Sequence, residues 1–257
     1  MAIKKARVIR SAALLASLCI AVSALHAETS TPPEEEKNWM LLLGGIASYS
    51  PVYSGSDEYG IGFAPLIIGS YHWNRVSVYI EGEEAGLNFH PFAKLPFTAS
   101  AGIMLGRSRD EDEDATLDGM GDMNSPIQAF AKISYGPEWL TANSRMRYAP
   151  TQKDSEPFRH SFLWDEYLEA EAMFGPVMAN AKAGVSFMDS TWSSIAYDED
   201  AGIESAFITV DVLIMATKHL GVYCGGDATW LLGNAADSKI SQLDRYAGGR
   251  VGVFYMF

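Results

Sequence analysis

The sequence predicts an all-β protein, a transmembrane antiparallel β-barrel of about 12 strands with short periplasmic turns and long external loops. Three observations lead to this fold class. Strand-like runs of about ten residues recur along the chain, apolar and polar residues alternate within them, and short links alternate with long ones. Transmembrane strands have this length, and an even number of them places both termini in the periplasm.

The composition fits an ordered protein that does not bind nucleic acid. Of the 257 residues, 12% are aromatic and 20% are charged, which argues against disorder. The first 27 residues contain four basic residues and no acidic one, so the rest of the chain has 15 basic against 32 acidic residues, a net charge of −17. A phosphate backbone would repel a polyanion of this size.

The N-terminus has the layout of a secretory signal peptide. Basic residues lie in Lys4–Arg10, an apolar stretch follows at Ser11–Leu25, and small residues precede a cleavage site after Ala27 or, alternatively, after Ala24. No later segment has 18 uninterrupted apolar residues, which excludes helical membrane spans. We therefore expect three parts, a cleaved signal peptide (1–27), a flexible periplasmic tail (28–37) and a barrel in the outer membrane of a Gram-negative cell (38–257).

Twelve runs bounded by Gly, Pro, Asn or Asp are expected to form the strands. In chain order they are Trp39–Tyr49, Gly60–Tyr71, Arg75–Glu81, Glu84–His90, Pro96–Arg107, Pro126–Tyr135, Glu138–Tyr148, Phe162–Phe174, Val177–Met188, Ile203–Ala216, Lys218–Leu231 and Leu243–Phe257. The third and fourth runs are short.

Within these runs the residues alternate with a period of two. In the seventh run, one face carries Leu140, Ala142, Ser144, Met146 and Tyr148, and the other carries Thr141, Asn143, Arg145 and Arg147. This pattern indicates a strand with one apolar and one polar face. A soluble antiparallel sandwich would show the same pattern, so the choice between the two folds depends on the links and the strand ends.

Both the links and the strand ends favour the membrane barrel. The short links are 72–74, 91–95, 136–137, 175–176 and 217, and they take turns with long links at 50–59, 108–125, 149–161, 189–202 and 232–242. The two-residue link 82–83 between the third and fourth runs is the exception. Aromatic residues collect at strand ends, as in two interfacial girdles. One predicted rim has Trp39, Tyr71, Trp73, Trp139, Phe174 and Tyr255, and the other has Tyr49, Tyr148, Trp164, Phe187 and Trp230.

Four segments resemble the MipA/OmpV family of outer-membrane proteins. The first is the first-loop segment Pro51–Tyr59 with Tyr53, Gly55, Asp57 and Tyr59, followed by Pro65. The second, in the third loop, is Arg107–Arg109 with the acidic run and then Leu117–Asp122 with Leu117 and Gly119. The others are the last-loop segment Leu231–Ile240 with Asp237 and Ser238, and the C-terminal Tyr255–Phe257. One departure is Lys239, where the family usually carries Pro. Tyr255 and Phe257 also resemble the signal that the barrel-assembly machinery recognises.

The resemblance implies a non-enzymatic protein of the cell envelope. The namesake of the family is described as a scaffold that joins a lytic murein transglycosylase to a peptidoglycan synthase, and other members are known mainly as antigens or adhesins. The expected partners are these two enzyme classes, the barrel-assembly machinery, outer-membrane lipid and lipopolysaccharide. The alternatives are a narrow channel for small solutes and a surface adhesin acting through acidic external loops.

Charged residues of both signs fall on the polar strand faces that would line the lumen. They form a predicted charge ladder of Arg145, Arg147, Glu169, Glu171, Lys182, Asp211, Asp227 and Arg250. The two arginines are expected beside Glu169 and Glu171. Because opposite charges on neighbouring strands attract, the ladder either plugs the bore or lines a conduit for small solutes. The sequence leaves both interpretations open.

The sequence predicts no catalytic residue, no metal site and no cofactor. The acidic run Asp110–Asp114 resembles a calcium loop, but an EF-hand needs Gly in place of Ala115 and a carboxylate in place of Gly121. None of the four histidines beyond the signal peptide has Ser two residues later, which is the pair that lipolytic barrels share. Adjacent Asp-His pairs and Gly-rich phosphate loops are also missing from the sequence.

Overall fold

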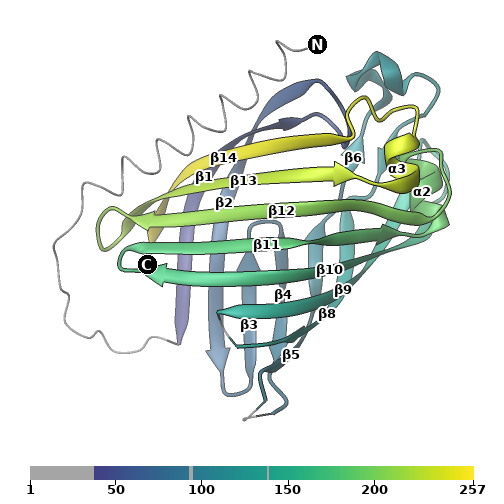
Figure 1. The fold of residues 1–257 in the computed structure, drawn as a ribbon. Helices are drawn as coiled ribbons and strands as arrows, with labels where there is room; N and C mark the ends of the chain where they lie inside the picture. Colours follow the sequence, from purple (N-terminus) through teal and green to yellow (C-terminus); the bar gives the residue numbers. More distant parts are fainter. Residues whose placement is uncertain (1–37, 93–94, 138) are drawn as a thin grey trace.

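A computed structural model describes residues 38–92, 95–137 and 139–257, which form a closed antiparallel β-barrel of twelve strands (Figure 1). The wall strands are β1 (Trp39–Pro51), β2 (Tyr59–Trp73), β3 (Val76–Glu81), β4 (Glu84–Phe89), β5 (Phe97–Leu105), β8 (Ile127–Tyr135), β9 (Leu140–Lys153), β10 (Arg159–Phe174), β11 (Val177–Met188), β12 (Gly202–Met215), β13 (Leu220–Leu231) and β14 (Arg245–Met256). Each strand pairs with the next, and β14 pairs with β1 to close the ring. The predicted fold class is thereby confirmed. The predicted signal peptide and tail lie outside the described residues.

The connections follow the predicted alternation, with one difference. Strands β9 and β10 extend to Lys153 and Arg159, so most of the predicted loop 149–161 is a hairpin with a link at 154–158. In this region Ala149 and Thr151 point inward and are buried, so inward and outward side chains continue to alternate. We call the end with the short turns and both strand termini periplasmic and the other end external, following the usual orientation of such barrels. In the described part of the chain, no helix has the length and apolar character needed to cross a membrane.

The two strand faces separate as the period of two predicts. Apolar side chains such as Ile133, Leu168 and Val253 point outward and are exposed, whereas Asn143 and Asp165 point inward and are buried. This pattern is expected when lipid covers the outer face and the polar face fills the lumen.

Some aromatic side chains in the bore lie against glycines on adjacent strands. The Phe254 ring lies over Gly221 of the neighbouring strand β13, where a Cβ would overlap the ring, and Gly44 on the other neighbour, β1, lies close to the Cα and Cβ of Phe254. Towards the periplasmic end, Phe254 joins Leu42, Leu66 and Tyr223 in a buried apolar cluster. A glycine on the neighbouring strand lets the aromatic ring lie flat against the wall, and this contact stiffens the wall.

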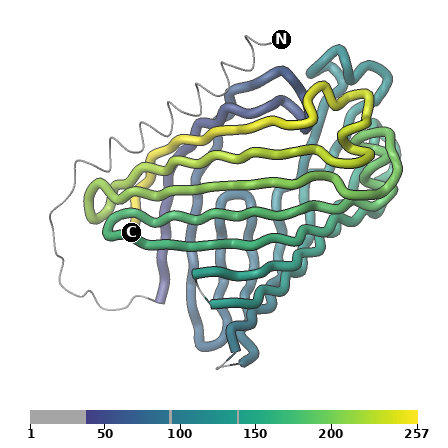
Figure 2. Tube along the Cα trace, in the orientation of Figure 1, coloured from purple at the N-terminus to yellow at the C-terminus, as the bar shows by residue number. Residues whose placement is uncertain are grey.

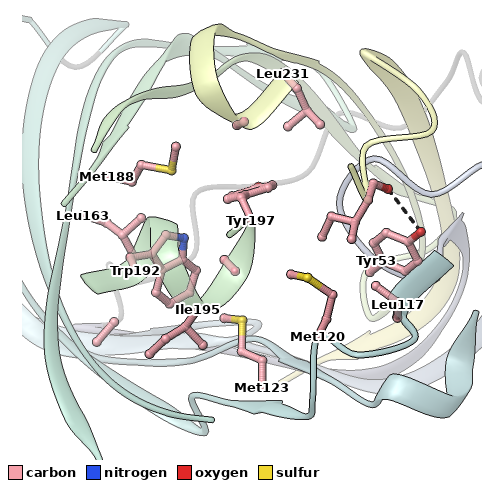
Figure 3. Packing of buried hydrophobic residues seen from close by; sticks show 14 residues of the cluster. Tyr53, Leu117, Met120, Met123, Leu163, Met188, Trp192, Ile195, Tyr197 and Leu231 are labelled. Atoms are coloured by element: carbon pink, nitrogen blue, oxygen red, sulfur yellow. Dashed lines mark hydrogen bonds between the residues drawn. The ribbon is translucent and has the colours of Figure 1, made fainter. Parts of the chain in front are cut away.

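The external loops fold inward and pack against one another as an external cap (Figures 1 and 2). The cap contains β6 (Ser108–Arg109), β7 (Met123–Asn124), α2 (Ser190–Ala196), α3 (Gly233–Asp237) and two 3₁₀ turns (Glu111–Glu113 and Ala115–Leu117). Its buried core brings together residues from five loops and strand ends, among them Tyr53, Leu117, Met120, Trp192, Tyr197 and Leu231 (Figure 3).

Candidate functional site

The centre of the lumen is an ion-pair cluster around Asp165 of β10, which is 1% exposed. Its carboxylate accepts hydrogen bonds from Arg145 Nε (2.9 Å) and Arg147 Nη2 (2.8 Å) of β9, and from Ser186 Oγ (2.7 Å) of β11. Arg145 Nη1 also donates to Glu84 Oε2 of β4 at 2.9 Å. Asp165 and Glu84 together therefore balance the two guanidinium groups in the middle of the bore.

The expected position of Arg145 and Arg147 beside Glu169 and Glu171 is wrong. The β9–β10 register places Arg145 opposite Asp165 and Thr141 opposite Glu169. The predicted strand ends Tyr148 and Phe162 are themselves paired in this register, so the expected partners were wrong because they were chosen by face alone and not by counting back from the turn. Asp165 lies on the same inward face as Glu169 and Glu171, so its parity was a signal that sequence reasoning missed. Parity gives the face but not the register.

The remaining predicted ladder residues form two further groups. Lys182 Nζ lies 3.2 Å from Glu169 Oε1 and 3.8 Å from Glu81 Oε1, and Asn180 Nδ2 donates to Glu169 at 2.9 Å and to Glu171 at 3.5 Å. On the other side of the bore, Arg250 Nη2 lies 3.2 Å from Asp211 Oδ1, to which the Tyr223 hydroxyl also donates. Asp227 lies next to this pair and lines the space above it. Seven of the eight predicted residues thus lie in three polar groups that occupy the bore, and Asp227 borders the third.

The family-motif residues of three separate loops meet in the external cap. The Tyr53 hydroxyl lies 3.0 Å from Thr116 Oγ1 and donates to Ile240 O at 3.3 Å. Gly55 adopts a φ of 91°, a left-handed conformation that favours glycine, and its carbonyl accepts from Leu243 N at 2.8 Å. The Asp57 backbone N–H donates to Gln242 Oε1 at 3.1 Å. These bonds join the first loop to the third and the last.

The other motif residues occupy supporting positions in the same cap. Leu117 is fully buried, and Gly119 has a φ of 82°. Ser238 Oγ donates to Tyr197 O directly after Asp237, the last residue of α3. Tyr59, at the external end of β2, stacks on Tyr49 with ring centroids 5.1 Å apart.

Local contacts shift two pKa values in the cap in opposite directions. Burial raises the pKa of the Tyr53 phenol. Hydrogen bonds from the Thr116 backbone N–H and hydroxyl lower the pKa of Asp114, and Gln242 Nε2 also donates to that carboxylate at 3.1 Å. Asp114 is therefore held in its charged form where the third and last loops meet.

A second buried carboxylate, Glu204 of β12, was not identified from the sequence. It accepts hydrogen bonds from Tyr197 (3.0 Å), Arg107 Nη1 (3.3 Å) and Trp192 Nε1 (3.4 Å). Arg109, also buried, donates to the Ala196 carbonyl at 2.7 Å. Glu204 lies at a strand end next to a loop and belongs to no motif. Neither the alternation of faces nor a motif therefore identified it as a buried residue.

Three cavities follow the bore. One of about 470 Å³ lies beneath the cap, one of about 310 Å³ adjoins the ion pairs, and one of about 570 Å³ with a mainly apolar lining lies at the periplasmic mouth. The described residues contain no group of three or more His, Cys, Asp or Glu side chains arranged to hold a metal ion. At the periplasmic rim, the Tyr255 ring meets the Phe257 ring edge-on at 4.8 Å and stacks on His219.

Several solved outer-membrane barrels resemble this structure at low sequence identity. The translocator domain of the autotransporter NalP from Neisseria meningitidis is 12% identical, with 96% of each chain covered and a TM-score of 0.47. OmpT of Vibrio cholerae is 8% identical over 88% of this chain and 100% of that one, with a TM-score of 0.42. The anion-selective porin from Comamonas acidovorans is 11% identical over 85% and 98%, with a TM-score of 0.38. We draw no functional argument from these likenesses.

The sequence itself gives the more specific result. No curated protein matches the chain. Residues 43–257, which include nearly the whole barrel and all the motif loops described above, match the family described as "MltA-interacting protein MipA". The chain therefore belongs to the MipA family of outer-membrane-type β-barrels.

Proposed function

We propose that this barrel is a non-enzymatic envelope scaffold whose bore is closed, and that its periplasmic face binds a lytic murein transglycosylase and a peptidoglycan synthase. The observation that carries the closed bore is the Asp165 cluster, in which Arg145 and Arg147 are held in the middle of the lumen by charge-assisted hydrogen bonds. The name of the family supports the transglycosylase as a partner.

The partner surface would be the periplasmic face, where the turns are short. Phe92, in the turn after β4, is an exposed aromatic side chain at this end and could anchor a partner. The predicted tail 28–37, outside the described residues, is an acidic segment that precedes β1 in the sequence. We therefore place the docking surface on the tail and on the turn 91–95.

Capture of the purified enzymes tests this surface. We expect immobilised barrel to retain the transglycosylase, and we expect Phe92→Ser or deletion of 28–37 to weaken that retention several-fold. Lys239→Ala, an exposed change in the external cap, is the matched control. If both periplasmic variants retain the enzyme as well as the wild type, the docking surface is not where we place it.

A narrow channel is the second candidate, because the cavities adjoining the ion pairs offer space on both sides of them. Single-channel conductance in a planar bilayer separates the two functions. The plug predicts a silent wild type and discrete openings for Arg145→Ala/Arg147→Ala. Steps in the wild type whose ion preference changes in the variant would favour the channel.

A further inference from the structure

The barrel wall is incomplete on its external half between β2 and β5. Strand β3 pairs with β2 only over Ile68–Trp73, and the β3–β4 hairpin turns at Gly82 and Glu83. The external half of β2, residues 59–67, therefore has β1 as its paired neighbour on one side and no paired strand on the other within the described residues. Figure 1 shows the β3–β4 turn well below the external ends of the long strands.

The free edge of β2 is unsuited to pairing with another protein strand. Gly82 N donates to Ile67 O at 2.8 Å, so the backbone groups of Ile67 point towards β3. Because every second residue of a strand directs its backbone groups to the same side, those of Pro65 and Phe63 point into the gap. Pro65 has no N–H to donate, and proline at such a position prevents strand addition. A strand of a partner is therefore not the occupant that this edge selects.

The gap lies at the depth of lipid hydrocarbon. The stacked rings of Tyr49 and Tyr59 mark the external aromatic rim, and the gap extends from there about 26 Å along β2 to Ile67. On the outer side of this stretch, Ile61 is 71% and Phe63 is 84% exposed, as expected for lipid-facing side chains. The opening therefore faces the outer leaflet.

The 470 Å³ cavity lies behind the gap. Glu83 of the β3–β4 turn and Arg107 and Ser108, which follow β5, line it from the gap side. The residues of β2 that point inward at the gap, Gly62 and Ala64, are small and exposed. The external cap covers the cavity above and the Asp165 cluster lies beneath it, and the side lined by Glu83 and Arg107 is the one that faces the wall gap.

The cavity lining has the chemistry of a site for a cation. Three carboxylates line it, Glu83, Asp227 and Glu204, and of these only Glu204 forms an ion pair with Arg107. Glu83 and Asp227 form no ion pair with Lys or Arg within the described residues. Arg109 also lines the cavity and keeps its charge, because it donates only to neutral cap carbonyls, so three carboxylates face two guanidinium groups and the lining has one net negative charge. Tyr53, Tyr197, Tyr246 and Trp192 add aromatic rings, which attract cations and pack against apolar groups.

We propose that the gap between β2 and β5 is a lateral entrance through which amine-bearing amphiphiles pass from the outer leaflet into this cavity. The amine would lie near Glu83 and Asp227, and the hydrocarbon chain would lie in the gap beside Phe63. An anionic amphiphile of the same length would be repelled by the same carboxylates.

Photolabelling tests the entrance directly. Refolded protein in phosphatidylcholine vesicles is exposed separately to three probes that carry the same terminal diazirine. These probes are derivatives of dodecylamine, dodecanol and dodecanoate. Labelled peptides are located by mass spectrometry. We expect the amine to label the cavity segments around Tyr53, Tyr197 and Tyr246 several-fold more than the dodecanoate does, with dodecanol between them.

Two variants with matched controls make the test specific. Ala64→Trp places a large ring in the gap and should strongly reduce cavity labelling, whereas Ala131→Trp, an outward position on β8, should leave it unchanged. Glu83→Gln should reduce the preference for amine over alcohol, and Glu156→Gln in an external turn should not. A heat-modifiability gel confirms that each variant is folded.

The proposal fails if label appears only on outward-facing side chains, or if Ala64→Trp leaves cavity labelling intact. Equal labelling of the cavity by amine and dodecanoate would also overturn the assigned ligand class. None of these results depends on enzyme capture or conductance, so this inference and the scaffold proposal are tested separately.

Discussion

Asp165→Asn is the most direct test of how the bore is held closed. The substitution preserves the shape of the side chain but removes the negative charge that Arg145 and Arg147 share. The Arg147 side chain is 6% exposed and the Asp165 side chain 1%, so water cannot easily replace the lost interaction. Removing one partner of such a buried pair costs about 3–5 kcal/mol, mainly because a charge is left buried without compensation. We expect a loss of this size in the free energy of unfolding.

The assay is equilibrium urea unfolding from lipid vesicles, followed by tryptophan fluorescence. Glu166→Gln is the matched control, since Glu166 is the next residue of β10 and points outward to an exposed hydrogen bond with Ser144. We expect that control to change stability by about 0.5 kcal/mol or less. In a double-mutant cycle, Arg147→Gln should recover part of the Asp165→Asn loss, with a coupling of about 1 kcal/mol or more. A loss below about 1 kcal/mol for Asp165→Asn, or additive effects in the cycle, would refute the argument that the cluster is a cooperative unit.

Two further predictions follow from the aromatic packing and from the cap. Gly221→Ala should destabilise the barrel by about 1–3 kcal/mol in the same urea assay, because the new methyl group overlaps the Phe254 ring, and Phe254→Leu in the same chain should recover part of the loss. If the double variant loses as much stability as Gly221→Ala alone, the overlap with the Phe254 ring is not the cause. In the cap, the lowered pKa of Asp114 means that its contribution is present above the unfolded value of about 3.9 and is lost as the pH falls through the lower folded value. Pepsin cleavage of the loop 106–126 should therefore increase below about pH 4, and Asp114→Asn should show the higher cleavage already at pH 5; a wild type and variant cleaved alike at both pH values would contradict it.

The sequence carried enough information for the fold but not for the pairing inside it. Number, order and faces of the strands follow from a period of two, which reflects only whether a side chain meets lipid or lumen. Which charges pair depends on the register, and the faces alone do not give it: a shift of four residues keeps every side chain on its face but changes every partner, as with Arg145 and Glu169. The motif residues Tyr53, Leu117 and Ser238 could be found as separate loop segments, but their meeting in one cap depends on the closure of the ring.

The ladder also explains how a wall with a gap keeps its shape. Each strand of the short β3–β4 hairpin contributes one carboxylate near its turn, and both reach across the bore: Glu84 to Arg145 of β9, and Glu81 to Lys182 of β11. Strand β11 lies six strands from β3 in the ring of twelve, so the latter pair spans its full width. These contacts replace the strand pairing that the hairpin lacks on its external side. Glu84→Gln should therefore increase hydrogen exchange of the turn amides around Gly82 while leaving β12 and β13 protected. Exchange that rises equally in all strands would mean that Glu84 stabilises the whole barrel rather than holding the edge of the gap.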